Sequence, residues 1–152
     1  MTFQYPSPGV GDVASYMTAG LPWVSSSAIP SGSTWTINFP YVTSELFIEN
    51  AGILASTLGL GFTLSGSQGT GPSGSTCNFR LNSSTTTNGT FFAHVRCKTL
   101  FVTALTNNVT ASVFAGLTVI KTNQFPTLTG SSNPYLSSSI PDPVFGYSTG
   151  LG

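Results

Sequence analysis

The sequence predicts an all-β protein, an antiparallel β-sandwich built as a single jelly roll with extended N- and C-terminal arms. Three observations lead to this prediction. No segment shows helical periodicity of useful length. Roughly seven to nine short stretches with strand character lie between turn signals, and the stretch 109–120 alternates apolar and polar residues without a break. Such half-buried strands need an opposing apolar layer, which a sandwich supplies.

The stretch 109–120 is the longest alternating run of the chain. Four large residues are expected on its inward side: Val109, Val113, Leu117 and Val119. Their burial contributes roughly 6–12 kcal/mol, whereas fixing the backbone of the run costs about 11–22 kcal/mol, so the strand needs partners. Phe114 and Ile120 are expected on the outer side. Two large apolar residues there indicate a face covered by an arm or by a neighbouring subunit.

Shorter stretches with strand character precede this run. The predicted strands are 13–18, 34–39, 41–50, 58–65, 77–81, 91–97 and 99–105. Alternation in 41–50 places Leu46 and Ile48 inward and Phe47 outward. The proline at position 40 confines the break between 34–39 and 41–50 to an edge or a bend.

Turn and loop signals separate these strands. Gly, Pro and Ser mark loops at 25–33 and 66–76, and the segment 82–90 is a polar loop that contains the turn signal Asn88-Gly89. The turn Thr106-Asn107-Asn108 joins 99–105 to 109–120, which predicts that these two strands pair as a hairpin.

The chain is expected to form one sandwich domain, residues 13–120, between two arms. Residues 1–12 are rich in Pro and Gly and predict an N-terminal arm. Residues 121–152 carry four prolines and isolated aromatics, too apolar for a disordered tail and too broken for a regular element. They predict an extended C-terminal arm that lies against its own domain or a neighbour. The predicted assembly contacts are Phe114, Ile120, Phe125, Tyr135, Phe145 and Tyr147.

The chain has very few charges. Four Lys or Arg balance four Asp or Glu, so the net charge is zero, and charged residues make up 5% of the chain, against about 25% in a typical domain. This balance argues against nucleic acid as a partner, because phosphate binding needs clustered Lys and Arg. A neutral surface is also poorly protected against self-association, which suggests a protein that lives in an assembly.

Neither a secretory signal nor a membrane span is expected. The first twelve residues show no basic segment followed by an apolar one, and no apolar run approaches 18 residues.

The residues that could carry chemistry are few, and we expect no catalytic residue, no cofactor and no metal. His94 is expected to be a half-exposed residue on a strand face rather than part of a catalytic triad. Glu45 and Glu49 would lie about 13 Å apart along a strand, too wide for a glycosidase pair. One His and two Cys lack the number and the paired spacing of a zinc site. The protein is therefore predicted not to be an enzyme.

Two further features stay open at this point. Cys77 and Cys97 either pair as a disulfide across neighbouring strands, which would stabilise by about 3 kcal/mol, or remain two buried thiols. Exposed aromatics on a sheet can also form a sugar-stacking platform. The candidates are Trp23, Trp35, Tyr41, Tyr135 and Tyr147, although alternation with Ile37 and Phe39 assigns Trp35 to the core.

Three phrases resemble small β-rich virion proteins of double-stranded DNA viruses. They are GVGDVASYMTAGLPWVSS at 9–26, FPYVTSELFIENAG at 39–52 and VFAGLTVI at 113–120, followed by a Ser/Gly-rich end. The resemblance implies a single jelly-roll-like capsid component, of the vertex, minor capsid or decoration type, with no catalytic residues to carry over. The chain lacks the basic arm with which many capsid proteins bind the genome, which implies a place on the outer shell.

The expected function is that of a non-enzymatic viral structural protein that acts through contacts between subunits. Its partners would be other copies of itself, in a trimer or a pentamer, and other capsid proteins. It would be assembled in the host cytoplasm and located at the outer capsid or virion surface. The alternative is an adhesin or receptor-binding head for a host glycan, with the loops 65–76 and 82–90 as the contact surface.

Overall fold

The computed structural model describes residues 20–52, 55–62, 64–68, 78–84 and 86–124. Its elements in chain order are β1 (Pro22–Ile29), β2 (Thr34–Asn38), β3 (Tyr41–Asn50), β4 (Ser56–Gly61), the short helix α2 (Leu64–Gln68), β5 (Phe79–Ser83), β6 (Gly89–Ala93), β7 (Thr99–Thr106), β8 (Val109–Lys121) and the 3-10 turn η2 (Thr122–Gln124).

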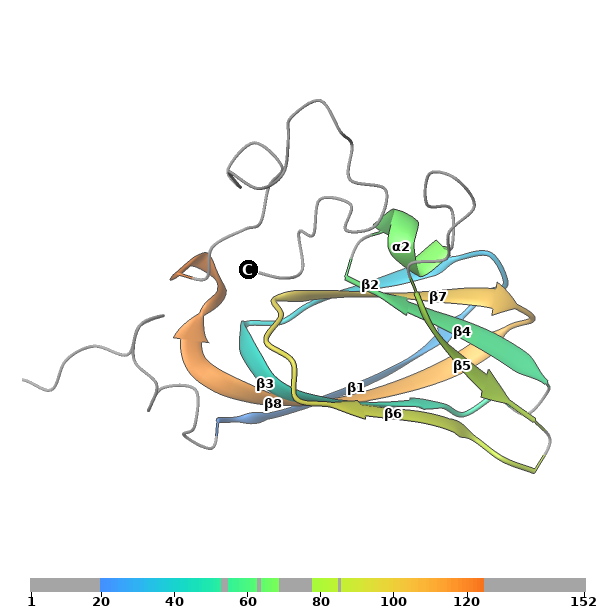
Figure 1. The fold of residues 1–152 in the computed structure, drawn as a ribbon, viewed down its shortest axis with the longest axis horizontal. Helices are drawn as coiled ribbons and strands as arrows, with labels where there is room; N and C mark the ends of the chain where they lie inside the picture. The colour runs from blue at the N-terminus through green and yellow to red at the C-terminus, as the bar shows by residue number, and fades with distance from the viewer. Residues whose placement is uncertain (1–19, 53–54, 63, 69–77, 85, 125–152) are drawn as a thin grey trace, which may run out of the picture.

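The eight strands form two four-stranded sheets that pack against each other (Figure 1). Sheet A has the order β1-β8-β3-β6, sheet B has the order β2-β7-β4-β5, and all neighbouring strands are antiparallel. The predicted all-β antiparallel sandwich is confirmed.

The strand pairs are nested along the chain. The first strand pairs with the last (β1 with β8), the second with the seventh, the third with the sixth and the fourth with the fifth. The chain changes sheet at every connection except the one between β4 and β5. As a result, β1 begins beside the later part of β8, where Pro22 pairs with Gly116.

The core lies between the sheets and is built from the inward side of each strand. Alternation in β3 buries Leu46 and Ile48 and leaves Phe47 exposed, as predicted. The main buried cluster consists of Ile29, Ile37, Phe39, Leu46, Ile48, Leu58, Leu60, Leu81, Cys97, Leu100, Val102, Ala104, Val109, Ala111, Val113, Ala115 and Leu117.

The end of β8 departs from simple alternation. Toward the pair Tyr41–Lys121, the register between β3 and β8 shifts twice. At this irregularity the hydroxyl of Thr118 donates a hydrogen bond of 2.8 Å to the carbonyl oxygen of Val42. A bulge of this kind adds a residue on one strand and reverses which of the following side chains point inward.

Because of the bulge, the side chains of two residues point to the side of the strand opposite to the predicted one. Val119, expected inward, is 43% exposed, whereas Ile120, expected outward, is fully buried in a small second cluster with Val42. Ile120 thus has no surface open to a partner in the single chain, and its role as an assembly contact stays a prediction. Phe114 lies before the bulge and is exposed, as predicted.

The predicted hairpin between the last two strands is wrong. The stretch 99–105 lies in β7, which pairs with β2 and β4 in sheet B, whereas β8 pairs with β1 and β3 in sheet A. The turn carries the chain from one sheet to the other through Asn107, whose φ is 57°. The physical reason is that both edges of each strand are already hydrogen-bonded to other strands, β7 to β2 and β4 and β8 to β1 and β3, so neither has an edge left for the other.

Several predicted boundaries also move. Residues 25–29 were predicted as part of a loop because their side chains are rich in hydroxyls. They belong to β1, where pairing with β8 holds them in a strand. The strand predicted at 58–65 ends at Gly61, and α2 follows at Leu64. The strand predicted at 77–81 is β5, displaced by two residues toward the C-terminus, and the strand predicted at 91–97 is β6, which begins two residues earlier and ends four residues earlier.

The predicted arm boundary at 121 falls within an element, because Lys121 is the last residue of β8 and η2 follows it. The N-terminal arm, the strand at 13–18 and the C-terminal residues from Phe125 onward, with Tyr135, Phe145 and Tyr147, lie outside the described residues. Across the described ranges, no helix is long and apolar enough to cross a membrane.

Candidate interaction surface

The outer face of sheet A carries a continuous row of apolar side chains, one from each strand. Val24 of β1 pairs with Phe114 of β8, Phe114 pairs with Phe47 of β3, and Phe47 pairs with Phe92 of β6. Residues paired in register point to the same side of a sheet. We call Val24, Phe114, Phe47 and Phe92 the apolar row. Three strand spacings give it a length of roughly 14 Å.

The side chains of the apolar row are open to solvent. The exposed fractions are 71% for Val24, 37% for Phe114, 39% for Phe47 and 57% for Phe92. Single exposed apolar residues are ordinary on protein surfaces, whereas a contiguous exposed patch marks a site of interaction. The row is such a patch and spans the full width of the sheet.

Local alternation explains why these residues point outward. Phe47 lies between the buried Leu46 and Ile48, and Phe114 lies between the buried Val113 and Ala115. In β6 the neighbouring ring of Phe91 packs inward on the core, so Phe92 must point to the opposite face.

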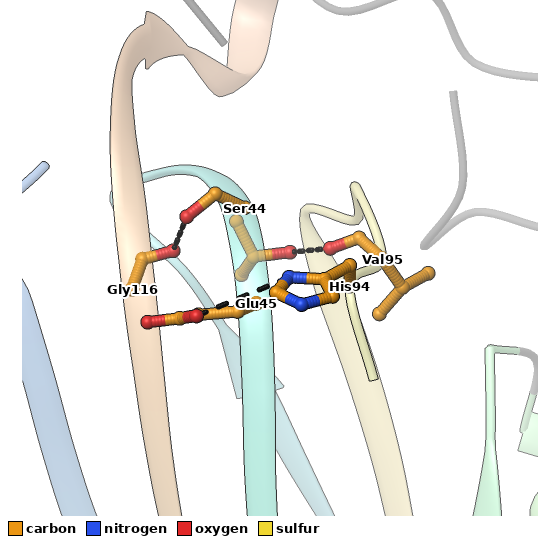
Figure 2. Close-up of polar contacts among 6 residues, drawn as sticks. Ser44, Glu45, His94, Val95 and Gly116 are labelled. Atoms are coloured by element: carbon orange, nitrogen blue, oxygen red, sulfur yellow. Dashed lines mark hydrogen bonds and ion pairs between the residues drawn. The ribbon is translucent and has the colours of Figure 1, made fainter. Parts of the chain in front are cut away.

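One side of the apolar row is bordered by His94 and Glu45, whose side chains lie close together. His94 Nδ1 lies 3.9 Å from Glu45 Oε2, and the His94 ring meets the Phe92 ring edge-on, with 5.0 Å between centroids. In Figure 2 a dashed line marks this contact between the Glu45 carboxylate and the His94 ring. Both side chains are open to solvent, so the pair adds little stability. It supplies a polar border to an apolar surface.

Ser44 does not extend this pair into a catalytic arrangement. Its hydroxyl donates a hydrogen bond of 3.0 Å to the carbonyl oxygen of Gly116 (Figure 2). A nucleophile would instead be hydrogen-bonded to a base. His94 lies just after the end of β6 rather than within a strand, and its side chain is 74% exposed rather than half-exposed, with Glu45 as its neighbour.

The other side of the apolar row is also polar. Ser26, Ser112, Glu49 and Thr90 form the next register row across the four strands. Asn88 Nδ2 donates a hydrogen bond of 2.8 Å to Glu49 Oε1. Glu45 and Glu49 thus lie on opposite sides of the row, as the four-residue spacing predicts.

The outer face of sheet B differs, because α2 covers part of it (Figure 1). The hydroxyl of Thr103 on β7 donates a hydrogen bond of 2.8 Å to Ser67 of α2. On β4, a Cβ added at Gly59 or Gly61 would lie under 3.0 Å from the backbone of Ser67. The chain covers this face with its own helix, and the close approach requires glycine.

The aromatics predicted as a sugar platform lie elsewhere. Trp23, Trp35 and Tyr41 are half-buried and pack against the core, and the Trp23 ring meets the Phe39 ring edge-on at 5.1 Å. Tyr135 and Tyr147 lie outside the described residues. The sequence analysis missed Val24 and Phe92, although the adjacent Phe91-Phe92 pair signals that one of the two rings points outward.

Cys97 is a buried free thiol. Burial raises the pKa of Cys97 from 9.0 to about 11, while the hydrogen bond with the Thr43 hydroxyl acts in the opposite direction. Cys77 lies outside the described residues. A buried neutral thiol is a structural group and a poor nucleophile.

Metal-ligating side chains do not gather anywhere in the described ranges: no group of three or more His, Cys, Asp or Glu there could hold a metal ion. Comparison with protein-family models yields no matching family, and a search of curated proteins yields no match. The outer face of sheet A is therefore the candidate functional site on its geometry alone.

Proposed function

We propose that this protein is a non-enzymatic viral structural protein, a capsid-surface component of the vertex, minor capsid or decoration type, which acts through contacts between subunits. The observation that carries the proposal is the apolar row, exposed on a sheet face of a chain with zero net charge. Such a face is suited to contact with another protein surface, and little charge repulsion opposes that contact.

The strand order supports the viral part of this proposal. We infer that the sandwich is a single jelly roll, since eight strands are nested in four antiparallel pairs divided between two sheets. The resemblance of three sequence phrases to small virion proteins favours the same fold. Because a fold alone does not define a function, the nested order strengthens the proposal only together with the exposed row.

The chain enters and leaves the sandwich on neighbouring strands. Leu117 N donates a hydrogen bond of 3.1 Å to the carbonyl oxygen of Leu21, just before β1. The described chain therefore enters β1 and leaves β8 at the same end of sheet A. Segments that begin at one place can reach the same neighbouring subunit, which fits the arms expected from the sequence.

The first test is the mass of the purified protein by light scattering over a range of concentrations. A pentamer favours a vertex protein and a trimer favours a decoration protein. A particle incorporation assay with the other capsid proteins is the second test. We expect the full chain to be incorporated and a chain lacking 125–152 to remain folded without being incorporated. A full chain that neither self-associates nor enters particles contradicts the proposal.

A glycan-binding head is the second candidate. The observation that favours it is the edge of sheet A at β6, where the exposed Phe92 ring lies beside His94 and Glu45. An aromatic ring next to hydrogen-bonding groups is suited to a sugar, which has apolar faces and polar edges. A glycan array tests this candidate: binding lost in Phe92→Ser supports it, and no binding by the full chain contradicts it.

A further inference from the structure

We propose that β1 pairs with β1 of a second copy of this chain, antiparallel and about a two-fold axis at Ser26, so that the two four-stranded A sheets join edge to edge into one continuous sheet. The proposal deepens the assembly function proposed above and rests on it for its role in a particle. It names an edge and a partner, and it leaves the outer faces of both A sheets open.

β1 is the longest edge strand of the sandwich. Sheet A ends in β1 and β6, and sheet B ends in β2 and β5. β1 has eight residues, whereas each of the other three edge strands has five. Proteins usually protect a long edge with a charge or a bulge. β1 carries no charged residue, and its register with β8 is unbroken, so this edge is open to another strand.

The hydrogen bonds of sheet A show which backbone groups of β1 face its open edge. In an antiparallel pair, residues that exchange hydrogen bonds alternate with residues that do not. Leu117 N donates a hydrogen bond of 3.1 Å to the carbonyl oxygen of Leu21. The register continues from this pair, so every second residue after Leu21 bonds to β8. The N–H groups of the residues between them, Val24, Ser26 and Ala28, therefore point away from β8.

The polarity of this edge is the same in both directions along the chain. Residues 22–30 are PWVSSSAIP, with three serines centred on Ser26, two apolar residues on each side and a proline at each end. A two-fold axis places residues at equal distances from it opposite each other. With the axis at Ser26, Val24 faces Ala28 of the second copy, Ser25 faces Ser27, and Ser26 faces its own counterpart. Each pair thus matches in polarity, as favourable cross-strand pairs do.

This alignment also uses every outward N–H group of the edge. Val24 donates to the carbonyl oxygen of Ala28 in the second copy, Ser26 to Ser26 and Ala28 to Val24, which gives about six hydrogen bonds in all. The two prolines face each other where neither has an N–H to donate, so the ladder ends there. Main-chain hydrogen bonds supply the affinity when a strand is added to a sheet edge. Such a contact does not need a large buried face.

Charge repulsion does not oppose the contact. β8 lies between β1 and β3, the strand that carries Glu45 and Glu49. In the joined sheet, the β3 strands of the two copies are separated by five strand spacings, roughly 24 Å. The screening length in physiological salt is about 8 Å. The carboxylates of the two copies are therefore too far apart to repel each other strongly.

The first experiment compares two substitutions at Ser26 in the full chain by sedimentation equilibrium. Ser26→Pro removes an outward N–H and leaves the ladder to β8 intact, since proline is tolerated on an edge strand where its nitrogen faces solvent. Ser26→Thr keeps the N–H and is the matched control. We expect the dimer dissociation constant to rise at least about tenfold in Ser26→Pro and to stay within about twofold of wild type in Ser26→Thr. Thermal unfolding checks that both variants are folded.

The second experiment tests the position of the axis without a proline. Because Ser26 faces its own counterpart, Ser26→Lys and Ser26→Glu chains each repel their own copies and attract each other. We expect a mixture of the two to form heterodimers at least about fivefold more tightly than either chain dimerises alone. Val24→Lys and Val24→Glu are the control pair, since the two copies of position 24 lie roughly 14 Å apart in the dimer. Equal gains at the two positions overturn the proposed axis.

The outcomes separate this contact from the assembly function. Self-association unchanged in a folded Ser26→Pro chain overturns the edge contact, and incorporation of the full chain into particles then still supports the function. Dimerisation that appears only after deletion of 1–19 or 125–152 means that the chain's own segment occupies the edge, which also overturns the contact. A full chain that neither dimerises nor enters particles overturns both proposals.

Discussion

The hydroxyl of Thr103 on β7 donates a hydrogen bond of 2.8 Å to the hydroxyl of Ser67 on α2, and both side chains are buried. Ser67 in turn donates to the carbonyl oxygen of Leu64 at 2.8 Å. Thr34 of β2 lies 2.8 Å from the Thr103 hydroxyl, and since Thr103 donates to Ser67, Thr34 supplies the proton of this bond. Strands of sheet B and the helix above them are thus joined by one directional chain of hydroxyls.

Replacing Thr103 by Val breaks this chain without changing the shape of the side chain much. We expect Thr103→Val to lower the free energy of unfolding by about 1–3 kcal/mol, because the buried Ser67 hydroxyl loses its donor. Urea denaturation measures the change. Thr36→Val on β2 is the control, since Thr36 is exposed, and we expect a change within about 0.5 kcal/mol. Equal effects at both positions contradict the anchoring role.

Local patterns predicted the parts of the fold that depend on one strand at a time. Alternation alone assigned Leu46 and Ile48 to the core and Phe47 and Phe114 to the outer face, and the structure agrees. These assignments need no knowledge of which strands are neighbours, because the side-chain period of a strand is fixed by its own backbone.

Features that depend on distant partners could not be predicted in this way. The pairing of β1 with β8 joins residues 80 to 94 positions apart, and without it the hydroxyl-rich stretch 25–29 has the pattern of a loop. The bulge that turns Ile120 inward is a property of the β3–β8 ladder. The apolar row likewise appears only when three registers are combined, so alternation alone placed Phe47 and Phe114 on the outer face and missed Val24 and Phe92.

Asn50 provides a second prediction, because it is a fully buried amide with every hydrogen bond made inside the protein. Its Nδ2 donates to the carbonyl oxygens of Ser56 at 3.3 Å and Leu81 at 3.1 Å, and its Oδ1 accepts from Gly52 N at 3.1 Å. A carboxyl group in its place would direct an oxygen at two carbonyl oxygens.

We therefore expect Asn50→Asp to be strongly destabilising near neutral pH, by about 3 kcal/mol or more. Burial and the two carbonyls raise the pKa of the introduced carboxyl above its unfolded value of about 3.9. The penalty is then smallest below pH 4 and grows as the pH rises, which urea titrations at several pH values measure. Asn82→Asp, at an exposed asparagine on β5, is the control and should show no such dependence.

The turn between β7 and β8 provides a third prediction. Asn107 has a φ of 57°, and its Nδ2 donates a hydrogen bond of 2.8 Å to the carbonyl oxygen of Ala55. Asparagine is among the few residues that adopt this left-handed conformation readily. Asn107 therefore meets a backbone requirement and also makes a side-chain contact. Substitution by glycine and by alanine separates these two contributions to stability.

Asn107→Gly keeps the backbone conformation accessible and removes only the side-chain hydrogen bond, so we expect a loss of about 1 kcal/mol or less. Asn107→Ala removes the bond and adds the left-handed penalty of roughly 1 kcal/mol. Thermal unfolding should therefore rank wild type above Asn107→Gly and Asn107→Ala last. If the alanine variant matches the glycine variant, the backbone conformation contributes nothing to the crossover between sheets.

Cys97 yields a prediction on alkaline pH. Burial raises the pKa of its thiol from 9.0 to about 11, so the folded chain holds this proton more tightly than the unfolded chain does. The stabilisation by the neutral thiol is fully present below pH 9 and is lost as the pH rises toward 11. The two-unit difference corresponds to about 3 kcal/mol of unfolding free energy.

The contribution of this thiol is isolated by comparison with Cys97→Ala, because tyrosine and lysine side chains also titrate above pH 9. Cys97→Ala should be less stable than wild type at pH 8, since it leaves a cavity beside Thr43. The gap between the two proteins in urea denaturation should narrow steadily between pH 9 and 11. A gap that stays constant over this range means that the thiol ionises equally well in the folded and unfolded chains, and the core around Cys97 is then open to water.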